Sequence, residues 1–237
     1  MISKRLTPRT AFVIGASRGI GFAAVEAFLA DGYVVAATHR GSGAPTGSIG
    51  FDVDIRNHDG IKESLRIFTE EHGRLDTLVV NAGIVRQDLL LRLDIDSLRE
   101  VFEVNTFGAM MAVRHAQPRM KRNAGSVVLI SSESAKVGIP GSSHYTASKA
   151  ALEGFMRSAM WELGKQGIRI NVIAPGPTET DMLQSLYEPA RARLLSASPL
   201  GRFAEPREIA EVIRWASQST YLNGASIPVT GGEGLGF

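Results

Sequence analysis

The chain lacks cysteine, strong net charge and any long apolar run, and each absence excludes a class of protein. Its 237 residues contain no Cys, and 26 Lys and Arg stand against 24 Asp and Glu, a formal net charge of +2. A chain without cysteine forms no disulfide bond and no thiolate metal site, which suits a reducing compartment. So small a net charge gives no strong attraction to nucleic acid. We therefore expect a cytoplasmic protein that does not bind nucleic acid.

We do not expect the sequence to direct the chain to a membrane. The opening residues MISKRLTPRT contain no apolar stretch of the kind that a signal peptide requires. The most apolar window, FVIGASRGIGFAAVEAFLADG, is interrupted by Arg18 and by glycines, so it cannot span a bilayer. The five histidines show no paired spacing of the kind that metal ligands have. We expect no membrane contact and no metal site.

Short apolar runs alternate with amphipathic stretches along nearly the whole chain. Helical patterns such as GFAAVEAFLADG and DSLREVFEVNTFGAMMAVRHAQPRM lie between runs that have the length of strands. Buried strands that alternate with helices are typical of a parallel sheet with helices on both faces. We predict one α/β domain over residues 1–237, a doubly wound, Rossmann-like parallel sheet with strands at residues 11–14, 34–38, 77–80, 127–130, 169–174 and 227–229. The alternation stops at residues 179–199, which we expect to form a mobile substrate loop.

A glycine-rich loop connects the first predicted strand to the first helical pattern. It reads Gly15-Ala-Ser-Arg-Gly19-Ile-Gly21. Glycines let a backbone turn tightly and approach a pyrophosphate, while a helix N-terminus offers free N–H groups. A glycine cluster by itself is weak support, because any tight turn uses glycine. Its place between the first strand and the first helix makes nucleotide binding the better interpretation.

The second predicted strand ends without the acidic residue that would bind a ribose 2′-hydroxyl. The sequence there reads VVAATHRGSG, with Arg40 where an arginine accommodates a 2′-phosphate. Arg18, inside the glycine loop, supplies a second cation for the same phosphate. Solvated arginines at loop ends are common, but two cations where an acid is missing favour NADP(H) over NAD(H).

The stretch HYTASK places Tyr145 and Lys149 four positions apart, on one face of a helix. Such a pair is often only part of a solvated surface. A free tyrosine has a pKa of about 10, and lowering it toward 7 needs roughly 4 kcal/mol. A positive charge about 4 Å away supplies roughly that amount at an effective dielectric constant of about 20. Lys149 is therefore able to make Tyr145 an acid that protonates a carbonyl oxygen as hydride arrives.

These motifs resemble those of the short-chain dehydrogenase/reductase family, and the resemblance extends from Ala11 to Gly232. It implies that Ser132 hydrogen-bonds the substrate carbonyl, and that Asn105 supports a water linking Lys149 to solvent. It also implies that Lys149 orients the cofactor ribose. A serine after a strand is often only a helix cap, and an asparagine in a helix often only a core hydrogen bond. Four residues in family order favour catalysis, and the implied catalytic set is Ser132, Asn105, Tyr145 and Lys149.

The same resemblance implies cofactor contacts along most of the chain. Asp54-Ile55 resembles the pair that contacts adenine, and Asn81-Ala82-Gly83 resembles the turn beside the cofactor. The run PGPTET resembles the loop around nicotinamide. The implied NADP(H) site comprises Gly15, Ser17, Arg18, Gly19, Ile20, Gly21, Arg40, Asp54, Ile55, Asn81, Ala82, Gly83, Tyr145, Lys149, Pro175, Gly176, Thr178 and Thr180.

Three stretches are similar to 3-oxoacyl-acyl-carrier-protein reductases: NAGIVRQDLLLRLD, SPLGRFAEPREIAEV and GASIPVTGGEGLGF. The run THRGSGAP resembles the actinobacterial branch, which includes a mycobacterial long-chain β-ketoacyl reductase. The resemblance implies a homotetramer that reduces the β-carbonyl of a 3-oxoacyl thioester with NADPH, the acyl group being carried by acyl-carrier protein or coenzyme A. Lys121, Arg122 and Lys165 lie near the carrier-docking positions of the family, although solvated surface charge is the commoner explanation.

The chain departs from the family pattern at supporting positions. Ile14, Val80 and Thr230 replace residues that usually supply a hydrogen bond. Val137 stands where the mycobacterial enzyme has tryptophan, so the acyl chain length stays open. Two alternative functions also stay open. A reductase or dehydrogenase of another ketone or alcohol, such as a polyketide intermediate, would keep the same catalytic set, whereas a non-enzymatic NADPH sensor would not need a tuned phenol.

Overall fold

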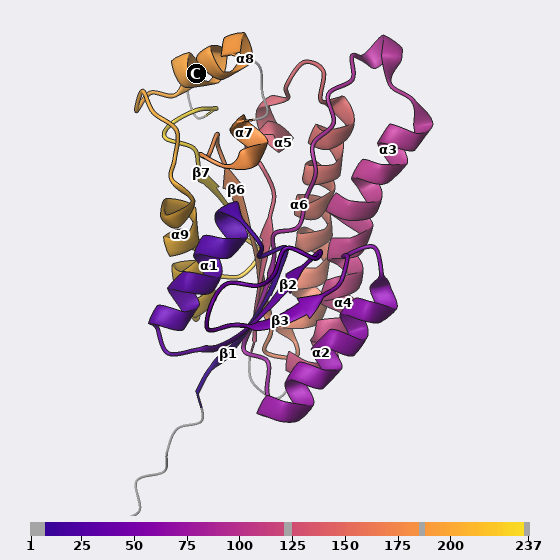
Figure 1. Cartoon of the computed structure of the whole chain (residues 1–237), viewed down its shortest axis with the longest axis vertical. Coiled ribbons are helices and arrows are strands. Elements are labelled where there is room, and N and C mark those ends of the chain that lie inside the picture. The colour runs from indigo at the N-terminus through magenta and orange to yellow at the C-terminus, as the bar shows by residue number, and fades with distance from the viewer. Residues whose placement is uncertain (1–7, 121–124, 185–187, 235–237) are drawn as a thin grey trace, which may run out of the picture.

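The structure is a computed structural model that describes residues 8–120, 125–184 and 188–234. Strands and helices alternate along the chain (Figure 1). The strands are β1 (Thr10–Ile14), β2 (Val34–His39), β3 (Ile49–Asp52), β4 (Thr77–Val80), β5 (Ser126–Ile130), β6 (Arg169–Pro175) and β7 (Ser226–Val229). The helices are α1 (Gly19–Ala30), α2 (His58–His72), η1 (Leu90–Arg92), α3 (Ile95–Phe102), η2 (Glu103–Phe107), α4 (Gly108–Met120), α5 (Ser134–Val137), α6 (Ser143–Gly164), α7 (Asp181–Gln184), α8 (Glu188–Ala197) and α9 (Pro206–Gln218).

The described strands form one seven-stranded sheet in the order β3-β2-β1-β4-β5-β6-β7. Every neighbouring pair is parallel. The chain winds outward from β1 to β3, returns to the centre, and winds outward in the other direction from β4 to β7. This arrangement confirms the predicted fold class. In such sheets ligands bind outside the carboxyl ends of the strands, where the strand order reverses.

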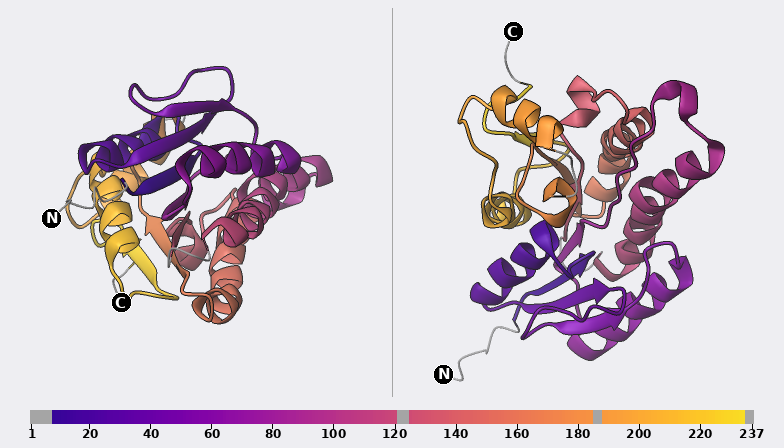
Figure 2. Two further views of the ribbon diagram at one scale, coloured as in Figure 1. Left: turned by 90° about the horizontal axis from the view of Figure 1, so that it is seen from below. Right: turned by 45° about the horizontal axis from the view of Figure 1, so that its top comes forward.

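Helices cover both faces of the sheet (Figures 1 and 2). α1 and α9 pack together on one face, whereas α2, α4 and α6 cover the other. Because both faces are covered, β1 is buried at every residue and reads as a continuous apolar run. Its side chains alternate between two cores: Phe12 and Ile14 join the core under α2 and α4, and Ala11 and Val13 join the core under α1 and α9.

Three segments differ from the prediction. β3 was not predicted, because its four residues IGFD lie at the sheet edge, are only partly buried and give a weak apolar signal. The helical pattern over residues 96–120 is divided by η2, a five-residue π-helix. The expected loop at residues 179–199 contains α7 and α8. Pro189 lies in the first turn of α8, where a proline fits because its missing N–H has no helical partner to lose. The mobility of this segment stays a prediction.

Two expected absences concern membranes and metals. Across the ranges that the structure describes, no helix combines the length and apolar composition needed to cross a bilayer. Within the same ranges, no three His, Cys, Asp or Glu side chains lie close enough together to hold a metal ion.

Candidate active site

The glycine loop lies at the carboxyl end of β1 and leads into α1. Gly15 and Gly19 have φ angles of +80° and +57°, which favour glycine. A Cβ on Gly21 would overlap the Gly15 carbonyl oxygen, so no larger residue fits there. The side chain of Arg18 does not cap the helix, and the first turn, GIGF, contains no acid. The first N–H groups of α1 are therefore available to an anion such as a pyrophosphate.

The turn Asn81-Ala82-Gly83 after β4 packs directly against the glycine loop. Asn81 Nδ2 donates to the Gly15 carbonyl at 2.7 Å, and the Ala82 N–H donates to the Ile14 carbonyl at 3.0 Å. A Cβ on Gly15 would lie 2.6 Å from the Cα of Ala82. Two predicted parts of the cofactor site therefore touch, although they are 66 residues apart in the sequence. The glycine loop and the turn after β4 together form a cradle that any added Cβ would fill. This cradle fits a dinucleotide.

At the carboxyl ends of β2 and β3, two arginines share one carboxylate. Arg56 donates to Asp54 at 3.0 and 2.8 Å, and Arg40 Nη1 lies 3.5 Å from Asp54 Oδ2. The hydrogen bonds from Arg56 lower the pKa of Asp54 to about 2, so it is ionised at neutral pH. The buried Ile55 packs against Gly108 of α4. The adenine contact expected of Asp54 and Ile55 stays a prediction, and Arg56 is a third cation that the sequence analysis missed.

Arg18, the other predicted phosphate-binding cation, pairs with the first residue of α7. Its Nη1 lies 2.9 Å from Asp181 Oδ2, and the two side chains are 70% and 62% exposed. So exposed a pair is weak, which leaves Arg18 able to exchange Asp181 for a phosphate. A Cβ on Gly19 would lie 3.0 Å from Thr180 Cγ2, so the start of the 179–199 segment lies against the glycine loop.

Tyr145 lies in the first turn of α6, and its hydroxyl is hydrogen-bonded to the Ser132 hydroxyl. Burial raises the pKa of Tyr145, and the bond to Ser132 only partly offsets this. This direction is opposite to the expected lowering by Lys149. The sequence could show that the two residues are neighbours, but not how far the phenol is buried. A phenol that keeps its proton at neutral pH is suited to act as an acid.

Lys149 lies one turn further along α6 and is buried, with 4% of its surface exposed. Its Nζ donates to the Ile130 carbonyl at 2.8 Å and lies 6.0 Å from the centre of the Tyr145 ring. A Cβ on Gly83 would lie 3.1 Å from the same Nζ. Burial lowers the pKa of Lys149 to about 8. The amine therefore lies between the end of β5 and the Gly83 turn, beside the cofactor cradle.

Asn105 lies inside the π-helix η2 and is 1% exposed. Its Oδ1 accepts from the Ile84 N–H at 2.8 Å, and its Nδ2 donates to the Ile84 carbonyl at 2.9 Å and to Ser148 Oγ at 3.0 Å. Ser148 Oγ in turn donates to the Tyr145 carbonyl at 2.7 Å. π-helical turns often occur at functional sites. Here the side-chain amide fastens the turn after β4 to the helix that carries Tyr145 and Lys149.

Replacing Asn105 by alanine is expected to lower the free energy of unfolding by about 2–4 kcal/mol, because the Ile84 N–H, the Ile84 carbonyl and Ser148 Oγ would lose their buried partner. Urea unfolding followed by circular dichroism measures the loss. Asn105→Asp keeps an acceptor for the Ile84 N–H but no donor, so we expect a second loss of stability. A loss below about 0.5 kcal/mol in the alanine variant would contradict the fastening role.

The loop after β6 adjoins the Ser132 turn. The Glu133 N–H donates to the Pro175 carbonyl at 2.9 Å. Thr178 Oγ1 donates to the Gly176 carbonyl at 3.0 Å, and Thr180 Oγ1 donates to the Thr178 carbonyl at 3.2 Å. These bonds keep the loop folded at the carboxyl edge of the sheet, beside the proposed catalytic residues.

Comparison with known proteins identifies the family. A family model described as enoyl-(acyl carrier protein) reductase matches residues 15–233. The chain belongs to the short-chain dehydrogenase/reductase family. It is 37% identical over 231 residues to 3-oxoacyl-[acyl-carrier-protein] reductase MabA of Mycobacterium bovis, covering 96% of this chain and 94% of the relative. It is 35% identical to the FabG reductase of Thermotoga maritima, covering 96% of this chain and 98% of the relative.

Solved structures of short-chain dehydrogenases/reductases have the same fold. The ligand-free aldohexose dehydrogenase of Thermoplasma acidophilum matches with a TM-score of 0.90 at 26% identity, covering 97% of this chain and 95% of that chain. A dehydrogenase/reductase of Sinorhizobium meliloti matches with a TM-score of 0.89 at 31% identity, covering 97% of this chain and 96% of that chain. As a member of this family, the protein is an oxidoreductase that depends on a nicotinamide cofactor.

In this short-chain dehydrogenase/reductase, small hydroxyl residues position the larger functional side chains. Ser131 Oγ donates to the Lys149 carbonyl at 3.0 Å, and Ser134 donates to Ser132 Oγ from both its N–H and its hydroxyl, at 3.2 and 3.0 Å. Ser148 connects Asn105 to α6. The sequence analysis missed Ser131, Ser134 and Ser148, because their partners are set by the tertiary structure.

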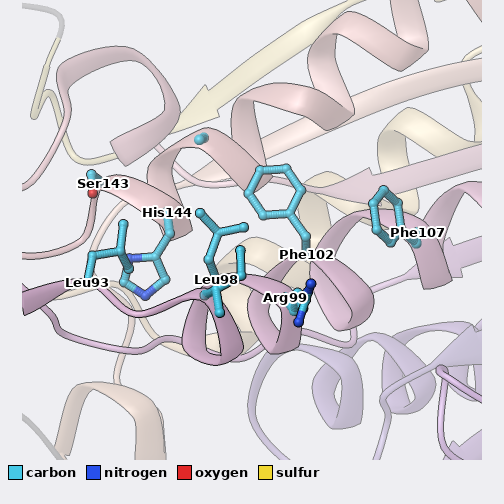
Figure 3. Close-up of a pocket in the computed structure, with 9 residues that line it drawn as sticks. Leu93, Leu98, Arg99, Phe102, Phe107, Ser143 and His144 are labelled. Atoms are coloured by element: carbon cyan, nitrogen blue, oxygen red, sulfur yellow. The ribbon is translucent and has the colours of Figure 1, made fainter. Parts of the chain in front are cut away.

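A separate groove of about 500 Å³ lies between α3 and α6 (Figure 3). Its walls include Leu98, Phe102 and Phe107, with His144 at one end. Among the described residues, neither Tyr145 nor Ser132 lines it. This apolar groove is therefore distinct from the catalytic edge of the short-chain dehydrogenase/reductase fold.

Proposed function

We propose that this protein reduces the β-carbonyl of a 3-oxoacyl thioester to a 3-hydroxyacyl product with NADPH. The observation that carries the proposal is the grouping of Ser132, Tyr145 and Lys149 beside the glycine cradle, at the carboxyl edge of the sheet. The relatives named 3-oxoacyl-[acyl-carrier-protein] reductases support the substrate class, because the match covers 94% and 98% of their lengths.

In this proposal each catalytic side chain has a defined task. The cofactor supplies a hydride when bound. Tyr145 donates its hydroxyl proton to the carbonyl oxygen as that oxygen becomes negative. Ser132 accepts two hydrogen bonds from Ser134, so its own proton is directed outward and stabilises the same oxygen. Lys149, held by the Ile130 carbonyl, binds the ribose hydroxyls and places a positive charge near the phenol.

Asn105 has a positioning task within the same site. Its side-chain amide is engaged by Ile84 and Ser148. It holds α6 against the turn after β4, so that Tyr145 and Lys149 face the cradle. A water that links Lys149 to solvent remains part of the proposal. Backbone groups of η2, rather than the side-chain amide of Asn105, would hold this water.

Arg40 and Arg18 select the phosphorylated cofactor in this proposal. Arg40→Ala is expected to raise the KM for NADPH about tenfold, because a charge-assisted hydrogen bond contributes about 1.5–3 kcal/mol and Arg40 is largely exposed. The KM for NADH should change less than about twofold, since NADH carries no 2′-phosphate to lose a contact. Initial rates with both cofactors measure this. Equal effects on the two cofactors would contradict the assignment.

The substrate class is tested by following the loss of NADPH absorbance with four compounds side by side. They are acetoacetyl-CoA, a long-chain 3-oxoacyl thioester, a simple cyclic ketone and an enoyl thioester. Preference for the 3-oxoacyl thioesters supports the proposal. Preference for the free ketone would keep the mechanism and overturn the substrate class. Preference for the enoyl thioester would instead favour the activity named in the description of the family model.

The proposal includes a homotetramer and an acyl-carrier protein as partner. The apolar groove between α3 and α6, and the exposed side chains of Leu89, Leu90 and Leu91, offer surface for another copy of the chain. Light scattering that returned the 25.5 kDa of one chain would contradict the tetramer. Lys165 follows α6, whereas Lys121 and Arg122 lie outside the described residues. A lower KM for acyl-carrier-protein thioesters than for coenzyme A thioesters would support the carrier as partner.

A further inference from the structure

Arg18 and Asp181 form an ion pair between two parts of the site that are far apart in the sequence. Arg18 Nη1 donates to Asp181 Oδ2 at 2.9 Å, across a separation of 163 residues. Arg18 belongs to the glycine loop, and Asp181 is the first residue of α7, at the start of the 179–199 segment. A cation that the proposed function assigns to the cofactor phosphate therefore already has a carboxylate partner.

Little besides this pair fixes the side chain of Arg18. The side chain makes no capping hydrogen bond at the start of α1. The two partners are 70% and 62% exposed, and among the described residues neither of them forms another ion pair. The guanidinium group can therefore exchange Asp181 for another anion while the rest of the fold stays in place.

The end of β2 lies next to the loop that carries Arg18. Gly15 N–H donates to Thr38 Oγ1 at 2.9 Å, and the following N–H donates to the Thr38 carbonyl at 3.0 Å. Arg40, the other cation assigned to the phosphate, follows Thr38 by two residues. A ribose 2′-phosphate is bound at the end of this second strand in dinucleotide-binding folds. If Arg18 bound the phosphate and Asp181 together, two anions would lie side by side and repel each other.

We propose that Asp181 competes with the cofactor phosphate for Arg18, and that it thereby lowers the affinity for NADP(H) without changing the affinity for NAD(H). A phosphate monoester carries a charge of about −1.5 to −2 at neutral pH, so it displaces the singly charged Asp181, but only by breaking the ion pair. A cofactor without the 2′-phosphate leaves the pair intact. Asp181 is thus a specificity-determining residue, and this role rests on the NADPH preference in the proposed function.

Other contacts hold the start of the 179–199 segment, so a variant of Asp181 keeps its fold. Glu179 N–H donates to the Ala204 carbonyl at 2.8 Å, and Ala204 N–H donates to the Pro177 carbonyl at 3.0 Å. We expect Asp181→Asn to change the Tm by less than about 3 °C, because an exposed ion pair contributes little to stability. The variant has nearly the same size and shape, and it removes only the charge.

A second acid offers a matched control for the general effect of negative charge. Glu26 of α1 lines the same groove as Asp181, between α1, α7 and the start of α9. Glu26 is exposed and has no ion-pair partner among the described residues. The other two acids of this groove, Glu179 and Glu205, pair with arginines. Glu26→Gln therefore removes a negative charge from the groove without freeing Arg18.

The test measures by calorimetry the Kd of adenosine 2′,5′-bisphosphate and of adenosine 5′-monophosphate, two probes that differ only in the 2′-phosphate. The salt concentration is held constant, because salt screens exposed charges. Asp181→Asn is expected to lower the Kd of the bisphosphate about two- to fivefold, the range that an exposed ion pair supplies, and to leave the Kd of the monophosphate unchanged. Glu26→Gln should change the Kd of the bisphosphate less than about 1.5-fold. NADPH and NADH should show the same difference as the two probes.

The Arg18→Ala variant separates competition for Arg18 from simple repulsion between Asp181 and the phosphate. If Asp181 acts through Arg18, adding Asp181→Asn to this variant should change the Kd of the bisphosphate less than about 1.5-fold. An equal gain in affinity in both backgrounds, or no gain in the wild-type background, would overturn the competition. A wild type that binds NADPH no more tightly than NADH would instead overturn the cofactor assignment of the proposed function. If no thioester is turned over, the substrate class fails, and the binding measurements still decide the role of Asp181.

Discussion

Replacing Tyr145 by phenylalanine is expected to lower kcat for 3-oxoacyl thioester reduction by about 10³-fold, because a positioned general acid contributes about 10²–10⁴-fold. The variant removes one hydroxyl and its hydrogen bond to Ser132, and it keeps the ring that packs in the first turn of α6. NADPH binding should change less than about threefold, since the cradle is built from the glycine loop and the turn after β4. Single-turnover NADPH oxidation measures the rate, and fluorescence titration measures binding.

Tyr221→Phe is the matched control for this variant. Tyr221 is fully exposed and lies beyond α9, away from the catalytic edge, so its loss should leave kcat unchanged. Turnover by Tyr145→Phe at a wild-type rate would remove Tyr145 from the mechanism. No turnover by the wild type with any ketone, together with intact NADPH binding, would favour the sensor instead.

Replacing Lys149 by methionine is expected to lower kcat/KM by about 10³-fold, because the variant loses both the contact with the cofactor ribose and the charge near the phenol. Methionine has a similar length, so the buried space stays filled. The Ile130 carbonyl loses its donor, which costs about 1–3 kcal/mol of stability and is visible as a lower Tm. Lys136→Met, at an exposed position on α5, is the matched control and should keep its activity.

The pH profile separates the charge of Lys149 from its contacts. Burial lowers the pKa of Lys149 to about 8, so the amine is positive below about pH 8 and loses its proton above it. The wild-type kcat/KM should therefore fall as pH rises through about 8. The folded pKa lies below the unfolded pKa of 10.5, so burial of this amine lowers the stability of the folded protein most below about pH 8. This penalty decreases as pH rises from about 8 to 10.5. If kcat/KM of the Lys149→Met variant still falls near pH 8, that fall must come from the titration of another group.

Local pattern was enough for the fold class and for placing Tyr145 and Lys149 on one helix. Short apolar runs that alternate with helical patterns can hardly form anything but a covered parallel sheet, and this sheet was observed. The glycines at positions 15, 19 and 21 occupy backbone and packing positions that only glycine fits. The i, i+4 spacing of Tyr145 and Lys149 placed both on α6. β3 was missed because an edge strand of four residues, two partly buried and two exposed, gives almost no periodic signal.

The sequence by itself determined which chemical groups are present and which of them share an element, because helix and strand periodicity are properties of neighbouring residues. Only the tertiary structure decided how those groups behave. Burial raises the pKa of Tyr145 and lowers that of Lys149, and it depends on segments distant along the chain. The same holds for Asp54, which is held by two arginines. A pKa is set by everything that surrounds a group in space, and a linear pattern records only what precedes and follows it.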